Sequence, residues 1–290
     1  MRVLFFGYSQ IGARALELLH RRGDEIAGMV THHDDPRENR WYRTPAEVAA
    51  DLGIPLIYSD ALGVRATDYA RDLAPDLVLS VMYRDLLPEG VLTAGRLGAL
   101  NVHPSLLPAY RGRAPINWVL VNGERETGVT LHHMVARADA GDIVGQRRIE
   151  IAPRETALSL YYKTEAESTS LLAEMLPLVA AGTAPRISQD GSKASKFGRR
   201  GPEDGRIDWH WDAHRVDCLV RAVAPPWPPA FFDVSSPAAG RVFVHAGEPA
   251  DCVPPGTSPG TVRSEDGTLQ VAAADRWFRI DDGAGLDLLG

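Results

Sequence analysis

The sequence has few cysteines, no long apolar run and no excess of positive charge, and each shortage excludes a class of protein. Cys218 and Cys252 are the only cysteines among 290 residues, too few for a disulfide framework. No segment approaches the roughly 20 apolar residues that span a bilayer. The N-terminus also lacks the continuous apolar stretch of a signal peptide. We therefore expect a soluble, cytoplasmic protein that binds no membrane.

The charge balance argues against a nucleic-acid partner. The chain has 31 Lys+Arg against 38 Asp+Glu, a formal net charge of -7. Affinity for a phosphate backbone comes largely from cations that displace counterions, so this balance excludes a polybasic binder of the histone or ribosomal type.

Strand and helix patterns alternate through the first 182 residues. Short apolar runs predict strands, and segments with apolar residues at helical spacing predict helices. This alternation indicates an α/β fold whose parallel sheet is covered on both faces. The predicted strands are residues 3–6, 25–31, 54–57, 75–81, 99–103 and 128–134, and the predicted helices are 11–19, 45–52 and 157–181.

The composition changes after residue 182, and a length of 290 residues favours two domains. Residues 183–205 are rich in small and polar residues without periodicity, which predicts a linker or an exposed crossing. Short strand-like runs separated by glycine and proline then fill residues 206–290. This pattern predicts a small β-barrel or sandwich.

Two familiar site patterns are incomplete. The segment G-Y-S-Q-I-G offers Gly7 and Gly12, but a dinucleotide fingerprint needs three glycines, so we assign them to the first turn between strand and helix. The adjacent pair His132 and His133 cannot easily chelate one ion, because neighbours in a strand point to opposite faces. The same holds for the pair at 32–33, and we predict no metal site.

A polar pair at the end of the strand at 99–103 carries the most chemical information. Asn101 and His103 are two residues apart, so an extended chain presents the amide and the imidazole on one face, and Pro104 then turns the chain away. An amide can donate to an oxyanion, an imidazole can move a proton near neutral pH, and a carboxylate can orient the imidazole. Asp139 and Asp142 are both candidates for that carboxylate.

Three ordered motifs resemble one enzyme family. They are N-V-H-P-S-L-L-P at 101–108, Y-R-G-R-A-P-I-N-W at 110–118 and R-A-D-A-G-D-I at 137–143. Together they resemble the formyltransferases that use N10-formyltetrahydrofolate. The motifs F-G-R-R at 197–200 and V-R-A-V-A-P-P-W at 220–227 are most similar to the branch acting on nucleotide-linked amino sugars. The likeness is strongest to the formyltransferase half of the bifunctional enzyme for UDP-4-amino-4-deoxy-L-arabinose, and 290 residues leave no room for that enzyme's dehydrogenase half.

The resemblance implies a Rossmann-like catalytic domain (1–182), a linker (183–205) and an OB-like C-terminal barrel (206–290). It implies that Asn101, His103 and Asp139 are the catalytic group, and so selects Asp139 over Asp142. The implied contacts of the folate donor are Met82, Tyr83, Arg84, Val135, Ala136, Arg137 and Ala138. The implied contacts of the acceptor are Ser105, Leu106, Leu107 and Pro108, and our candidates for its diphosphate are Arg111, Arg113, Arg199 and Arg200, whose forked guanidinium groups suit phosphate.

Other acceptors and roles stay open at this point. Methionyl-tRNA is the main alternative, but residues 206–290 contain 7 Lys+Arg and 12 Asp+Glu, a net charge of -5, which disfavours a domain that grips tRNA. Water is another acceptor, as in formyltetrahydrofolate hydrolases, and a degenerate binding module is disfavoured by the intact catalytic positions. We also expect a homodimer, with residues 225–232 as a candidate interface, and Pro229 stands where the family has glycine.

Overall fold

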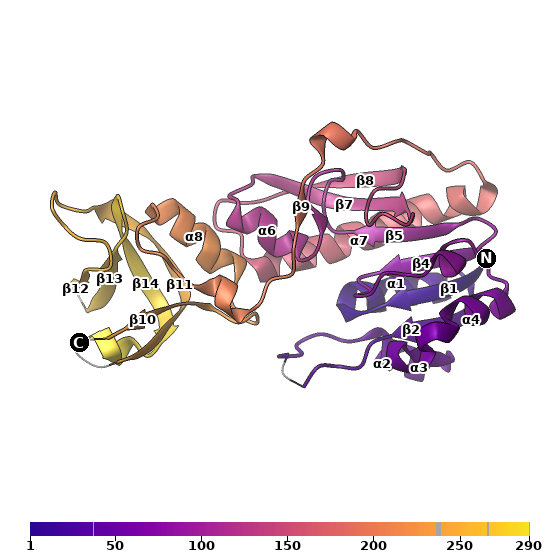
Figure 1. Cartoon of the computed structure of the whole chain (residues 1–290), viewed down its shortest axis with the longest axis horizontal. Coiled ribbons are helices and arrows are strands. Elements are labelled where there is room, and N and C mark those ends of the chain that lie inside the picture. Colours follow the sequence, from indigo (N-terminus) through magenta and orange to yellow (C-terminus); the bar gives the residue numbers. More distant parts are fainter. Residues whose placement is uncertain (37, 236–238, 266, 290) are drawn as a thin grey trace. The chain divides into compact units, whose positions relative to one another are not determined.

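The computed structural model describes residues 1–36, 38–235, 239–265 and 267–289, and within them the N-terminal apolar runs form one seven-stranded sheet (Figure 1). Its order is β3-β2-β1-β4-β5-β7-β8. The first five strands are parallel, as predicted, whereas β7 is antiparallel to both β5 and β8. The strands are β1 (Arg2–Gly7), β2 (Glu25–Thr31), β3 (Leu56–Tyr58), β4 (Leu77–Val81), β5 (Ala99–His103), β7 (Glu126–His133) and β8 (Ile143–Glu150).

Local sequence signals explain where a helix of this region begins and ends. α2 follows Thr44, whose hydroxyl accepts from the Glu47 N–H while the Glu47 carboxylate accepts from the Thr44 N–H. Gly53 ends the helix with a φ of 65°, which suits glycine. The predicted helix at 157–181 is confirmed as α7. The helices are α1 (Ser9–Arg21), α2 (Pro45–Leu52), α3 (Ser59–Leu62), α4 (Ala66–Leu73), α5 (Glu89–Leu92) and α7 (Ala157–Ala181), with 3-10 turns η1 (Gly63–Arg65) and η2 (Gly191–Lys193).

Helices cover both faces of the sheet. Leu4, Phe6 and Val78 lie on one face, in a buried cluster with residues of α4. Phe5 projects from the other face because side chains alternate along a strand, and α1 contacts β1 and β4. This double cover confirms the predicted α/β architecture. In the part of the chain that the structure describes, no helix is long and apolar enough to cross a membrane.

Contacts divide the chain into two units whose ranges interleave. The first comprises Met1–Gly112, Glu126–Glu150 and Tyr162–Phe197, and the second comprises Arg113–Arg125, Ile151–Tyr161 and Gly198–Gly290. The continuous domains expected from the sequence therefore cover most of each unit but not all of it. α6 (Pro115–Val121) packs against α8 (Ala213–Ala222), and this contact places α6 in the second unit. The composition of the sequence does not reveal this contact.

Residues 183–197 of the expected linker belong to the first unit. We call residues 186–197 the strap. Ile187 and Ile143 exchange two backbone hydrogen bonds of 2.7 and 2.9 Å. At its other end, β9 (Lys196–Phe197) pairs in parallel with β6 (Arg111–Gly112). The strap therefore ties the loop before β8 to the segment that follows β5.

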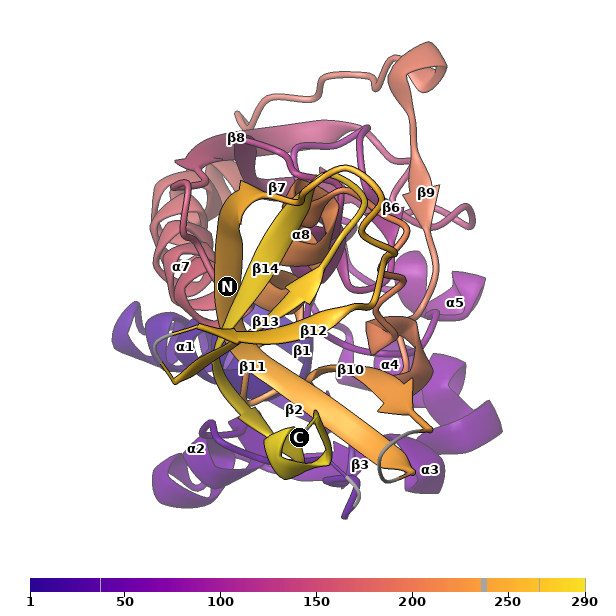
Figure 2. The ribbon, with the colours of Figure 1, turned by 90° about the vertical axis from the view of Figure 1, so that its left-hand side faces the viewer.

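The second unit contains a five-stranded antiparallel sheet with the order β10-β11-β14-β13-β12 (Figure 2). This confirms a separate C-terminal β domain. Among the described strand pairs, β10 and β12 stand at the two edges, so the pairing is that of an open sheet. The strands are β10 (Ala230–Val234), β11 (Gly240–Cys252), β12 (Val262–Glu265), β13 (Thr268–Ala272) and β14 (Arg276–Ala284), with 3-10 turns η3 (Pro202–Gly205) and η4 (Leu286–Leu289).

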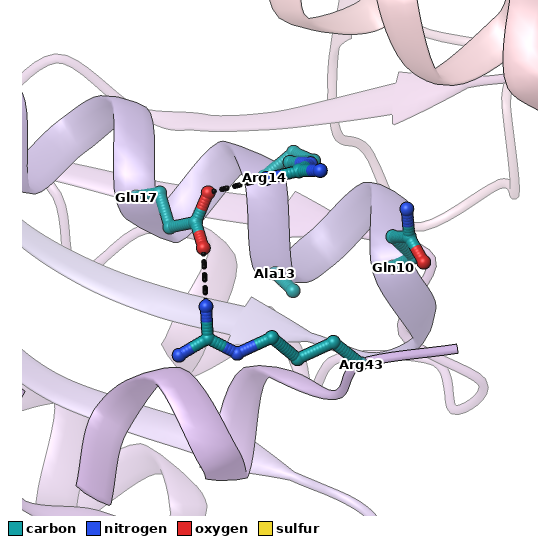
Figure 3. Close-up of a pocket in the computed structure, with 5 residues that line it drawn as sticks. All are labelled: Gln10, Ala13, Arg14, Glu17 and Arg43. Carbon is teal, nitrogen blue, oxygen red and sulfur yellow. Dashed lines mark hydrogen bonds and ion pairs between the residues drawn. The ribbon is translucent and has the colours of Figure 1, made fainter. Parts of the chain in front are cut away.

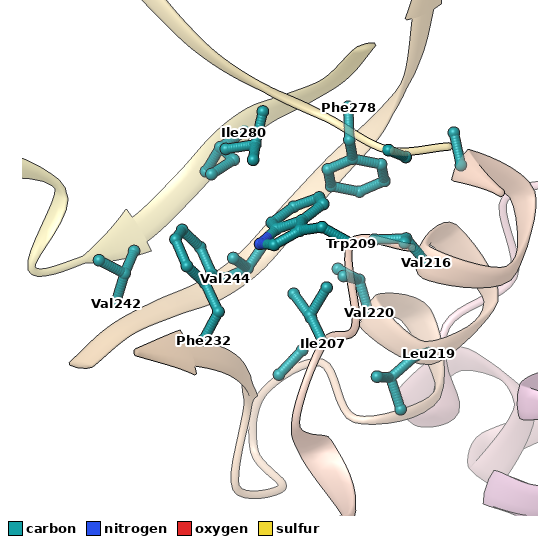
Figure 4. Close-up of a cluster of buried hydrophobic side chains, with 14 of the residues drawn as sticks. Ile207, Trp209, Val216, Leu219, Val220, Phe232, Val242, Val244, Phe278 and Ile280 are labelled. Atoms are coloured by element: carbon teal, nitrogen blue, oxygen red, sulfur yellow. The ribbon is translucent and has the colours of Figure 1, made fainter. Parts of the chain in front are cut away.

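The core of the second unit lies between this sheet and α8 (Figure 4). Trp209 packs edge-on against Phe232, with ring centroids 5.1 Å apart, and Phe278 lies in the same cluster. Phe232 and its neighbour Phe231 are buried, which removes them from the exposed surface of the expected dimer interface at 225–232. Pro229 directly precedes β10, so it removes no donor from a strand. The homodimer remains a prediction.

Gly112→Ala is expected to destabilise the protein. Gly112 has a φ of 101°, and a β-carbon there would overlap the carbonyl oxygen of Phe197. A side chain in a rarely populated backbone region costs on the order of 1–3 kcal/mol, before the overlap is counted. Urea unfolding followed by circular dichroism should show a lower free energy of unfolding. Gly191→Ala is the control, because nothing lies within 4 Å of its β-carbon position, and equal losses in both variants would contradict the prediction.

Candidate active site

The structure brings the three predicted catalytic side chains together. Asn101 and His103 share one face of β5, and Asp139 lies in the loop between β7 and β8. Nδ1 of His103 is 3.6 Å from Oδ1 of Asp139. This separation is longer than a direct hydrogen bond, so the two groups face each other without being locked together.

Main-chain groups hold both ionisable members of this trio. Nε2 of His103 donates to the carbonyl oxygen of Tyr110 over 2.8 Å, which places a proton on Nε2 and turns Nδ1 toward Asp139. Oδ2 of Asp139 accepts from the Gly112 N–H over 2.8 Å. Asp139 itself has a φ of 54°, in the left-handed region. The segment 110–112 therefore fixes the imidazole and the carboxylate at once.

His132 is a fourth member of the site that the sequence analysis missed. Its partner in the antiparallel pairing of β7 with β5 is Asn101. Nδ1 of His132 donates to the carbonyl oxygen of His133 over 2.8 Å, so Nε2 is an acceptor. That nitrogen lies 3.2 Å from Nδ2 of Asn101 and 3.6 Å from Oδ1 of Asp139. The carboxamide of Asn101 is thereby oriented, and its second N–H can donate to a bound oxygen.

The environment of His132 keeps its imidazole neutral. Burial, followed by repulsion from His103, lowers the pKa of His132 to about 4, although Asp139 acts in the opposite direction. A neutral ring retains the acceptor lone pair that Asn101 requires. A protonated His132 would lose this acceptor and place an unpaired charge in a buried position.

The predicted acceptor loop is tied to the sheet. The side chains of Ser105 and Leu107 are buried, whereas Leu106 and Pro108 are half-buried. Thr130, on β7, donates from its hydroxyl to the Ser105 carbonyl over 2.6 Å and accepts from the Leu107 N–H over 3.1 Å. These bonds hold the turn that follows His103.

The predicted folate contacts lie in two loops at the ends of β4 and β7. Tyr83 stacks on His32 with ring centroids 4.3 Å apart, and burial is the main cause that raises its pKa to about 12. Arg84 forms an ion pair of 2.6 Å with Glu38 and lies over the ring of Tyr8. Met82 precedes them with a φ of 58°. In the second loop, residues 135–137 are exposed and residue 138 is half-buried.

The four predicted diphosphate arginines have different surroundings. Arg111, in the first unit, is buried, and its Nε and Nη2 both donate to Gln189. Arg113 and Arg199 belong to the second unit and are exposed. Arg200 stacks on Trp118 at 4.5 Å, and its half-burial lowers the pKa of its guanidinium group.

A hollow between α1 and Arg43 is lined by none of the predicted site residues (Figure 3). It measures about 200 Å³ and is lined by Gln10, Ala13, Arg14, Glu17 and Arg43. Glu17 forms ion pairs of 3.0 and 2.9 Å with the two arginines, so the charges of this surface are paired with one another. Among the described residues, no group of three His, Cys, Asp or Glu side chains is placed to hold a metal ion.

Comparison with known families accounts for most of the chain. Residues 1–176 match the family model described as formyl transferase, and residues 200–283 match the model of the formyl transferase C-terminal domain. The chain belongs to the formyl transferase family. This confirms the family that the motifs resemble and establishes the protein as a formyltransferase. The candidate trio lies wholly within the first matched range.

Solved structures show the same fold at low sequence identity. An N-formyltransferase from Helicobacter canadensis, in complex with folinic acid and dTDP-3-aminofucose, is 16% identical with a TM-score of 0.75, and the match covers 97% of this chain and 98% of that one. A sugar N-formyltransferase from Shewanella is 17% identical with a TM-score of 0.69, covering 85% and 97%. HypX from Aquifex aeolicus is 21% identical with a TM-score of 0.67, covering 98% of this chain but only 44% of HypX.

His132 should make the stability of this formyltransferase depend on pH. Because its folded pKa of about 4 lies below its ordinary value of 6.5, the unfolded chain binds the proton more tightly. The stabilising effect of the neutral ring is complete above about pH 6.5 and is lost as the pH falls toward 4. Urea unfolding at a series of pH values should show a smaller loss over this window in His132→Gln than in the wild type. Replacing the exposed His210 with Gln is the control, and an unchanged slope in His132→Gln would contradict this role.

Proposed function

We propose that this formyltransferase moves a formyl group from N10-formyltetrahydrofolate to the primary amine of a nucleotide-linked amino sugar. The observation that carries the proposal is the convergence of Asn101, His103 and Asp139 within the family-matched unit. An amide donor, an imidazole and a carboxylate are the groups that acyl transfer to an amine requires.

Each member of the trio has a role that its surroundings support. The folate donor supplies a formyl carbonyl, and the free amine attacks its carbon. Nδ2 of Asn101, oriented by His132, donates to the oxygen as negative charge develops on it. Nε2 of His103 is occupied by Tyr110, so Nδ1 is the atom that can carry a proton toward the reacting centre.

Asp139 faces that Nδ1 and orients the proton there. The reaction forms one C–N bond and breaks another, and one proton passes in net terms from the amine to N10 of the folate. Oδ2 of Asp139 already accepts a hydrogen bond from the Gly112 N–H. Oδ1 is therefore the carboxylate oxygen placed to take part in moving this proton through His103.

Asn101→Ala is expected to lower kcat by about 10² to 10³, the usual cost of removing one oxyanion donor. His103→Ala is expected to lower kcat by about 10² to 10⁴, the usual contribution of general acid–base catalysis. Steady-state assays with formyltetrahydrofolate and an active amino-sugar nucleotide measure the loss, and His33→Ala, an exposed histidine, is the control. Thermal unfolding checks that the variants are folded. Wild-type turnover in either alanine variant would refute its catalytic role.

Three observations support a nucleotide-linked sugar as the acceptor. The motifs at 197–200 and 220–227 resemble the sugar branch, and structural neighbours include an enzyme in complex with dTDP-3-aminofucose. The second unit has Arg113 and Arg199 on its surface, and Arg199 directly precedes Arg200, which stacks on Trp118. Guanidinium forks suit a diphosphate. Arg111 suits this role less, because Gln189 engages two of its nitrogens.

The acidic C-terminal region disfavours methionyl-tRNA. Residues 206–290 carry a net charge of -5, whereas a domain that grips tRNA needs surplus cations. Hydrolysis remains the other alternative, since water can replace the amine at the same formyl carbon. Formate release in the absence of any amine, at the rate of the full reaction, would favour the hydrolase.

Thermal shift measurements separate the acceptor classes. At a concentration of about 100 times its Kd, a ligand that binds only the native state adds about 2.7 kcal/mol to stability. We therefore expect dTDP or UDP to raise Tm by several degrees, and bulk tRNA to leave it unchanged. Inorganic phosphate at the same concentration is the control for simple anion binding. Stabilisation by tRNA alone would overturn the sugar acceptor.

A further inference from the structure

Gln189, in the strap, contacts the two segments that hold His103 and Asp139. These segments are residues 110–112 and the loop between β7 and β8. Its Nε2 donates to the carbonyl oxygens of Asp139 (2.9 Å) and Gly141 (2.7 Å). Its Oε1 accepts from Nε (3.2 Å) and Nη2 (2.6 Å) of Arg111. Carbonyls only accept and a guanidinium only donates, so these contacts determine which way the amide of Gln189 is turned.

The strap is anchored on both sides of this residue. Before it, Ile187 pairs with Ile143, directly after the loop that contains Asp139. After it, Ser195 accepts from the Tyr110 N–H through its hydroxyl and from the next N–H through its carbonyl, each over 2.9 Å. Gln189 is therefore held between two fixed ends rather than on a free loop.

The backbone of Asp139 needs such support. Its φ of 54° is unfavourable for a residue with a β-carbon, and conformations of this kind persist only where the surroundings over-determine them. Gly112 holds the Asp139 side chain through Oδ2, whereas Gln189 holds its main-chain carbonyl. One contact therefore holds the side chain of Asp139, and the other holds its main chain.

Gln189 also restrains a buried positive charge. Arg111 is buried close enough to Asp139 for their charges to interact, and Arg137 repels it. Nε and Nη2 of Arg111 are engaged by Gln189. Without that acceptor, the guanidinium would gain by turning toward the nearby carboxylate, because a buried donor left unpaired is costly.

We propose that Gln189 is a positioning residue for formyl transfer, which holds the Asp139 main chain in its left-handed conformation and keeps Arg111 from pairing with the Asp139 carboxylate. The inference rests on the proposed roles of Asp139 and His103. Gln189 acts through these residues and need not touch either substrate. Its loss should therefore reduce turnover more than substrate binding.

Gln189→Met tests this proposal, since it preserves much of the side-chain volume and removes every hydrogen bond. A misplacement of about 1 Å can cost 10²-fold in rate, so we expect kcat to fall about 10- to 100-fold, with KM for the folate donor changed less than about 2-fold. Ser188→Ala is the matched control, because it removes a strap bond to Asp142 of 3.1 Å and leaves Asp139 untouched. A similar loss of kcat in both variants would overturn the proposal.

A double-mutant cycle asks whether Gln189 acts through Asp139. If it does, Gln189→Met should cost less than about 2-fold in an Asp139→Asn background, because residues that act as a unit are not additive. A purely structural role would give the full loss in both backgrounds, together with a lowered Tm. That result would overturn the proposal.

A substrate-free measurement separates this inference from the proposed function. In ¹⁵N-histidine NMR, the Nδ1 and Nε2 resonances of His103 should shift in Gln189→Met but not in Ser188→Ala. Unchanged His103 resonances in Gln189→Met would overturn the positioning role. If the wild type formylates no nucleotide-linked amino sugar, the acceptor proposal fails, and the NMR comparison still decides the role of Gln189.

Discussion

The chemistry that we propose for this formyltransferase depends on two main-chain hydrogen bonds from a three-residue segment. The carbonyl of Tyr110 holds one nitrogen of His103, and the N–H of Gly112 holds one oxygen of Asp139. The remaining nitrogen and oxygen then face each other at 3.6 Å. Both hydrogen bonds are made by main-chain groups, so replacing the side chain of Tyr110 cannot remove the carbonyl that holds His103. What matters is where the backbone lies, and β9 and the rest of the strap determine that.

The amide of Asn101 depends on a different constraint, the antiparallel register of β5 and β7. This register sets Asn101 opposite a buried His132, and burial keeps that ring neutral and able to accept. A parallel strand would not exchange hydrogen bonds in the same pairs, so the change of strand direction at this edge contributes directly to the site. The site therefore combines a strand register with a clamped loop, and each controls a different donor.

Part of the candidate site could be predicted from the sequence, and there are physical reasons why the other residues could not. Asn101 and His103 could be paired by their two-residue spacing, whereas Asp139 was selected only through resemblance to the family. His132 was set aside because spacing alone rules out chelation with His133 but says nothing of a partner on another strand. Gln189 lies in a stretch whose composition is typical of a linker, and the role that we propose for it rests on contacts with residues 50 and 78 positions away.

The strap also determines when the site can be completed during synthesis. All three residues of the trio have been added to the chain once residue 139 is made. The contacts of Gln189 with Arg111 and Asp139 can form only after the whole of α7 has also been made. The first family match itself ends at residue 176, before the strap begins. A nascent chain that has reached residue 139 therefore carries every proposed catalytic residue, but it lacks the contacts of Gln189 until residue 189 has been added.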